Sequence, residues 1–224
     1  MMRSTNAANG WNLAAAAISL AYPSVVGGRH HEAIGPITMN ATSGFPDHVF
    51  RRASGYIELG ELLVTGESVP PPVATKVLRR ALAELDQLPA ERRTGADACL
   101  LEGEALRALG EWEAAVPALT RAAEAKPGPL EAWLGLGWCW KRLGRLDEAI
   151  AALDRGLLVF PDQPILFYNL ACYHSLAGDV QAAIDHLTKA IALDNRFRDL
   201  TGAERDFDAI RSDPRFVAAT HVHV

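Results

Sequence analysis

The sequence contains only three cysteines, Cys99, Cys139 and Cys172, and no two of them form a C-x-x-C motif. This usage is typical of small buried apolar residues in a reducing compartment and argues against disulfides or a cysteine-based metal site. No block of Lys or Arg exceeds two residues, and the net charge is −5. The sequence therefore predicts no nucleic-acid partner held by phosphate contacts.

Apolar runs long enough to cross a bilayer are also absent, so we predict no membrane span. The only apolar run near the N-terminus is Leu13 to Ala21, which follows the single charge of Arg3. Residues 1–21 could be a weak signal peptide, although the run is rich in Ala rather than Leu. We predict a disordered leader over residues 1–45, with Met39 as an alternative start. The predicted location is cytoplasmic, with export as the alternative if the signal peptide is real.

Catalytic motifs are missing as well. The sequence has no nucleophile elbow, zinc-protease motif, phosphate-binding loop or dinucleotide fingerprint. Cys172 and His174 are close in sequence, but two residues along a helix point in nearly opposite directions, so the pair cannot form a catalytic dyad. We therefore predict that the protein is not an enzyme.

Metal and cofactor sites are not indicated either. The histidine pairs at residues 30–31 and 221/223 have no third ligand nearby in the sequence. Asp206 and Asp208 lie at a predicted helix start, where carboxylates complement the helix dipole, so capping explains them. The sequence predicts no metal and no cofactor.

What the sequence does contain is a period of 34 residues that runs from Ala96 to Phe197 without a gap. Three columns of this alignment hold one residue type each: Gly110, Gly144 and Gly178; Ala115, Ala149 and Ala183; Leu119, Leu153 and Leu187. Pro127 and Pro161 close two rows, and Asn195 stands at the same place in the third. A fixed period of this length predicts a solenoid of stacked helix pairs.

The middle row, Leu130 to Gln163, shows the pattern most fully. It has W-x2-L-G at Trp133, Leu136 and Gly137, followed by Trp140, Gly144, Ala149, Leu153, Gly156 and Pro161. This row resembles the tetratricopeptide repeat, and its neighbours resemble it with departures at Cys99, Glu102, His174 and Asn195. The resemblance implies an all-α fold, a right-handed superhelical solenoid of α-α hairpins.

The pattern also predicts where the parts of the chain begin and end. Helical spacing returns in divergent form before the regular rows, and the segment after them resembles the closing segment of bacterial arrays of this family. The predicted parts are a divergent helical repeat at 46–90, regular repeats at 96–129, 130–163 and 164–197, a C-terminal cap at 198–219 and a tail at 220–224.

The resemblance implies that the first helix of each repeat lines a concave groove that receives peptides or helices. From the spacing, the residues facing this groove should be Leu100, Glu104, Arg107, Leu134, Trp138, Lys141, Arg142, Ile165, Tyr168 and Cys172. If Trp140 fills the core of its repeat, Trp138 must face the groove, because the two rings cannot share one face. The alternative is that Trp138 only packs on Leu134 and Tyr168.

The family's carboxylate clamp, which grips the C-terminal acids of chaperones, is not expected. The clamp positions hold Leu100, Glu104, Gly135, Ile165 and Asn169, and the Glu104 carboxylate would repel an acid. An apolar or amphipathic protein or peptide segment, bound as a helix in the groove, fits better. We therefore predict a non-enzymatic adaptor for protein–protein interaction. The alternative is a structural or regulatory subunit of a larger assembly, envelope-associated if the leader is a signal.

Overall fold

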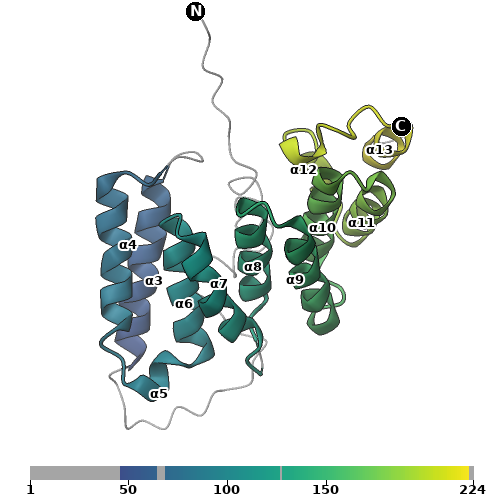
Figure 1. The fold of residues 1–224 in the computed structure, drawn as a ribbon. Helices are drawn as coiled ribbons and strands as arrows, with labels where there is room; N and C mark the ends of the chain where they lie inside the picture. The colour runs from purple at the N-terminus through teal and green to yellow at the C-terminus, as the bar shows by residue number, and fades with distance from the viewer. Residues whose placement is uncertain (1–45, 65–68, 127, 222–224) are drawn as a thin grey trace, which may run out of the picture. The chain divides into compact units, whose positions relative to one another are not determined.

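The computed structural model describes residues 46–64, 69–126 and 128–221, and every regular element within them is a helix (Figure 1). The all-α fold predicted from the sequence is confirmed. None of these helices combines the length and the hydropathy that crossing a bilayer requires. The predicted leader at residues 1–45 and the last three residues of the predicted tail lie outside the described residues.

The chain divides into two compact units, which are described separately. The N-terminal unit covers Asn40–Gly156 and the C-terminal unit begins at Leu157. The helices of the N-terminal unit are α3 (Pro46–Leu63), α4 (Pro72–Leu85), α5 (Ala90–Arg93), α6 (Ala96–Ala108), α7 (Trp112–Ala123), α8 (Leu130–Arg142) and most of α9 (Leu146–Val159). Those of the C-terminal unit are α10 (Pro164–Ala177), α11 (Val180–Leu193), α12 (Arg196–Leu200), η1 (Arg205–Phe207) and α13 (Pro214–Thr220).

The glycine column of the sequence marks the turn between the two helices of each regular pair. Gly110, Gly144 and Gly178 have φ angles of 78°, 72° and 83°, the left-handed region that costs glycine nothing. After each of them, the next backbone N–H donates to a carbonyl five residues earlier, at 2.9 Å in every case. The same turn, a glycine at positive φ followed by this hydrogen bond, therefore reverses the chain between the two helices of each regular pair.

A second glycine column allows the two helices of a pair to approach closely. A Cβ atom added to Gly103 of α6 would lie 2.5 Å from the side chain of Leu119 on α7. Gly60 of α3 has the same relation to Leu78 of α4, with a distance of 2.4 Å. The α3–α4 pair is thus packed like the regular pair that follows it, even though its sequence is divergent.

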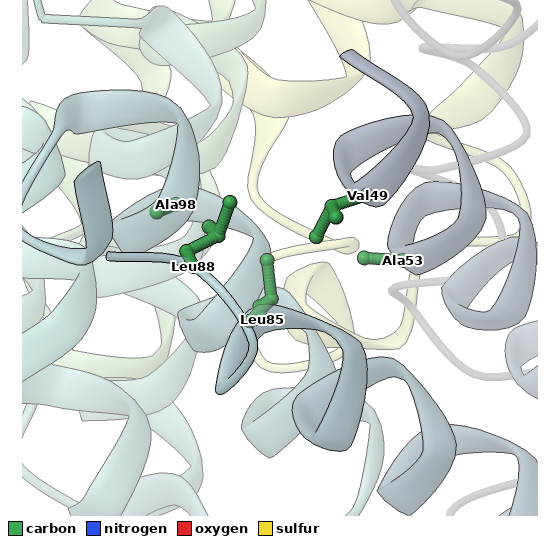
Figure 2. Close-up of a cluster of buried hydrophobic side chains, with 5 residues drawn as sticks. All are labelled: Val49, Ala53, Leu85, Leu88 and Ala98. Atoms are coloured by element: carbon green, nitrogen blue, oxygen red, sulfur yellow. The ribbon is translucent and has the colours of Figure 1, made fainter. Parts of the chain in front are cut away.

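The first two helix pairs share a hydrophobic core. Figure 2 shows five of its buried side chains, which come from α3, from the end of α4 and the loop after it, and from α6: Val49, Ala53, Leu85, Leu88 and Ala98. Their exposed fractions are 5% or less. Successive helix pairs of the N-terminal unit therefore stack through apolar contacts, as a solenoid requires.

The C-terminal unit contains the pair α10–α11 and the short helices that follow it. Tyr168 on α10 contacts Phe197 of α12 and Phe207 of η1, with ring centroids 5.1 Å and 5.7 Å away. Phe207 in turn contacts Phe216 of α13 at 5.4 Å. Four aromatic rings thus attach the segment after the last helix pair to the side of α10.

We predict that Gly144→Ala lowers the free energy of unfolding by about 1 kcal/mol, because an L-residue is strained at positive φ. No neighbouring atom lies within 4 Å of the added Cβ, so the cost comes from the backbone alone. Gly55→Ala is the matched control, since it places a methyl group in open space within α3 and should stabilise the protein by about 0.5–1 kcal/mol. Chemical denaturation of both variants measures the difference, and a shift of the same sign in the two would contradict the assignment of Gly144 to the turn.

Candidate functional site

The residues predicted to line a groove fall into two groups that the structure places in different units. Those on α6 and α8 belong to the N-terminal unit, whereas Ile165, Tyr168 and Cys172 on α10 belong to the C-terminal unit. Each group has its own neighbours.

In the N-terminal unit, the predicted site is centred on the guanidinium group of Arg107. Its side chain is only 4% exposed and forms ion pairs with Glu61 of α3 and Glu104 of α6. Arg107 Nε donates a hydrogen bond of 2.8 Å to Glu104 Oε2. One buried cation therefore links two acidic side chains from neighbouring helix pairs.

Burial and the charges of Arg107, Glu104 and Glu61 act together on the pKa values of Glu104 and Arg107. Burial raises the pKa of Glu104 and the attraction of Arg107 opposes that rise, while Glu61 adds to it. Burial alone would lower the pKa of Arg107, but Glu104 and Glu61 more than offset this, so its pKa is raised. Arg107 is therefore permanently charged, and the two carboxylates compensate it in a poorly solvated place.

Trp138 of α8 lies next to this cluster. Its ring centroid is 5.3 Å from the guanidinium carbon of Arg107 and 6.2 Å from the ring of Trp112, which it meets edge to face. The guanidinium carbon of Arg142 is 4.5 Å from the centre of Trp112 and 5.7 Å from that of Trp138. Trp112, Trp138, Arg107 and Arg142 thus form a cation–π cluster between α6, α7 and α8.

Trp140 does not fill the core of its repeat, which was the condition under which Trp138 would have to face the groove. Trp140 is only partly buried, and the guanidinium carbon of Arg145 lies 4.3 Å from its ring centre. The core position belongs to Trp133, which is 3% exposed and has Arg155 at 5.0 Å from its ring. Trp138 is also partly buried, and its aromatic neighbour Trp112 comes from the preceding helix pair.

The remaining predicted residues of α6 and α8 differ in exposure. Leu134 is 5% exposed and belongs to the core, whereas Leu100 and Lys141 are partly exposed. The part of the predicted set that can present a surface in this unit is therefore Leu100, Glu104, Trp138, Lys141 and Arg142.

The predicted residues of α10 do not offer an open surface, which is a second correction. Ile165, Tyr168 and Cys172 are 2%, 1% and 3% exposed. Rings from α12 and η1 pack on Tyr168, because the segment after the last helix pair folds back onto α10. Sequence spacing could not show that the chain's own C-terminal segment covers these residues.

Two residues of the N-terminal cluster were not predicted. Glu61 directly follows Gly60, just as Glu104 follows Gly103, so extending the glycine column to α3 would have found it. Trp112 is the first residue of α7, outside the helices that the resemblance places along the groove. No feature of the sequence indicated that its ring would reach Trp138.

The cluster does not supply an activated nucleophile. Cys139 feels the charge of Arg107, but burial is the larger effect and raises the pKa of its thiol to about 12. The thiol therefore stays protonated at neutral pH, when a nucleophilic cysteine would need the opposite shift.

Comparison with known proteins identifies the repeats. Residues 100–164 and 141–196 each match the family model of the tetratricopeptide repeat. Among solved structures, MamA MSR-1 C2 is 26% identical with a TM-score of 0.46, covering 64% of this chain and 78% of its own. A point mutant of MamA is also 26% identical, with a TM-score of 0.43 and coverages of 63% and 77%. No curated protein sequence matches the chain.

We predict that Arg107→Met lowers the free energy of unfolding by about 3 kcal/mol, because it leaves Glu104 poorly solvated and without its cation. Arg79→Met is the matched control, since the Arg79–Glu111 pair is an ion pair at the surface, with side chains 52% and 36% exposed. That substitution should change stability by less than about 1 kcal/mol. Urea titration of both variants at neutral pH measures the difference, and equal losses would show that Arg107 is an ordinary surface residue in solution.

Proposed function

Because residues 100–164 and 141–196 match the family model of the tetratricopeptide repeat, we propose that this chain is a non-enzymatic adaptor for protein–protein interaction. Its partner is an apolar or amphipathic protein segment, bound against the face of the N-terminal unit formed by α6 and α8. The residues that make this contact are Leu100, Glu104, Trp138, Lys141 and Arg142.

The proposal depends on the partial exposure of Trp138 and on the arginines beside its ring. Tryptophan and arginine are the residues most enriched at binding hot spots, and Trp138 is partly exposed with two guanidinium groups within 6 Å of its ring. Its contact with Trp112 limits the ring's freedom before any partner arrives. A side chain that is already ordered loses less conformational entropy on binding, which favours affinity.

The acidic side chain on the same face restricts the chemistry of the partner. Glu104 Oε1 lies 3.0 Å from the position that a Cβ of Gly135 would occupy, so the carboxylate rests against the bare backbone of α8. Arg107 is already paired with Glu61 and Glu104. A partner's terminal carboxylate would thus meet an acid rather than an uncompensated arginine. An amphipathic segment, with an apolar side for Trp138, avoids this repulsion.

The state of the cysteines supports a role in a reducing compartment, and we place the protein in the cytoplasm. Cys99, Cys139 and Cys172 are buried thiols, each on the first helix of a repeat. Buried thiols of this kind persist without oxidation where glutathione and thioredoxin are active.

The proposal predicts that Trp138→Ala weakens partner binding by about 2 kcal/mol or more, roughly thirty-fold. A photo-activated cross-linker at Lys141 of the full chain would capture the segment bound on this face, and mass spectrometry would identify it. Its affinity for each variant is then measured by calorimetry with the synthetic segment. Trp140→Ala is the matched control, because this ring lies on the same helix but contacts Arg145 instead of the cluster.

Lys141→Glu provides a second variant in case Trp138→Ala unfolds the protein, since Lys141 is only partly buried and its replacement leaves the core intact. Circular dichroism establishes which variants remain folded. Equal binding by wild type, Trp138→Ala and Lys141→Glu would refute this face as the binding site. Cross-linking to many different proteins, with no common segment among them, would refute it as well.

A further inference from the structure

Three potential metal ligands meet in the C-terminal unit, and none of them belongs to the face of α6 and α8. The Cys172 sulfur and one carboxylate oxygen each from Glu204 and Asp206 all lie within 4.8 Å of one another. Cys172 is on α10, whereas the two acids flank the start of η1. Cys172 and Glu204 are buried, at 3% and 2% exposure, so this group is not a solvated acidic patch.

The segment that carries the two acids is held in place by contacts at several points. The Ser175 hydroxyl on α10 donates a 2.7 Å hydrogen bond to the backbone carbonyl of Asp206. Arg211 donates to the carbonyls of Thr201 and Glu204, at 3.0 Å and 2.7 Å. These bonds hold the backbone carbonyls of Thr201, Glu204 and Asp206 in place. The three ligand atoms are therefore brought together by tertiary structure and not by a flexible loop.

A buried hydroxyl group accompanies the three ligands. Tyr168 lies one helical turn before Cys172, is 1% exposed, and its hydroxyl has no hydrogen-bond partner among the described residues. Its ring centroid lies 5.7 Å from that of Phe207, the residue that directly follows Asp206, so the phenol lies near the segment that carries the two acids. Its ring is fixed by Phe197 and Phe207. A neutral hydroxyl is thus held beside the group with its hydrogen-bonding capacity unused.

Two carboxylates and a thiol in a poorly solvated site repel one another once ionised, and a divalent cation removes that repulsion. We propose that Cys172, Glu204 and Asp206 bind one zinc ion, with the Tyr168 hydroxyl as the fourth ligand or as the partner of a zinc-bound water. Zinc accepts sulfur and carboxylate oxygen together in four-coordinate sites, whereas magnesium and calcium select oxygen alone. Binding replaces the Cys172 thiol proton by the metal, so one proton is released to solvent.

Such an ion would join α10 to η1 and to the residue before it. Its role would be structural, because all the ligands come from residues that hold the end of the chain against the last helix pair. The proposal does not depend on the adaptor function, since none of its residues lies in the N-terminal unit.

The test is a titration of the full-length, reduced protein with cobalt(II) and then with zinc(II). We expect one cobalt per chain and a near-ultraviolet charge-transfer band that reports a cobalt–thiolate bond, lost on addition of zinc. Competition against a chromophoric chelator gives the zinc affinity. Cys172→Ala should abolish the band and weaken zinc binding by more than about tenfold, as should Glu204→Gln. Cys139→Ala, which removes a buried thiol from the other unit, should change neither quantity.

Glu204→Gln and Tyr168→Phe keep the shape of the side chain, so they remain informative if Cys172→Ala does not fold. Zinc should raise the melting temperature of wild type and Cys139→Ala but not that of Glu204→Gln. Metal bound only by histidines would give no thiolate band and would overturn the proposal. A band that survives Cys172→Ala, or zinc binding that is unchanged in Glu204→Gln, would overturn it as well.

Discussion

The close approach of the two helices in the α3–α4 and α6–α7 pairs is the constraint on which the N-terminal unit depends. Gly60 and Gly103 have no room for a side chain, because Leu78 and Leu119 occupy the space that a Cβ would need. A helix pair packed this tightly cannot bury its outer apolar faces by itself, so the next pair must cover them. The shared core of α3, α4 and α6 is the direct result (Figure 2).

In the N-terminal unit that stacking brings α3, α6 and α8 next to one another. Equivalent positions of the period have very different roles. The residue that follows Gly60 in α3 is Glu61, and the residue that follows Gly103 in α6 is Glu104. One and two periods after Glu104, the same position holds Trp138 in α8 and Cys172 in α10. In the N-terminal unit, Arg107 forms ion pairs with both Glu61 and Glu104, and its guanidinium group lies near the ring of Trp138. Because Arg107 is buried, the pairing both holds the helices and orders the tryptophan that we assign to partner binding.

In the C-terminal unit the same position is used differently, because the end of the chain folds over it. Phe197 and Phe207 pack on Tyr168, and the backbone between them brings Glu204 and Asp206 to Cys172. Closing the end of a repeat array protects an apolar face from water. Here it also concentrates ionisable groups in a buried place, a situation that proteins commonly resolve with a metal or a counter-ion.

The sequence by itself determined the all-α fold, the period and the turns, since these depend on local causes. Gly110, Gly144 and Gly178 all adopt positive φ, as the turn between two helices requires. Where a glycine of one helix faces a leucine of the next, as Gly103 faces Leu119, the two helices approach closely. The sequence also predicted a set of groove-facing side chains on the first helix of each repeat. What only the tertiary structure decided was which of those side chains reach a surface. Trp112, Glu61 and the C-terminal aromatic rings approach them from segments between 26 and 46 residues away, where helical spacing carries no information.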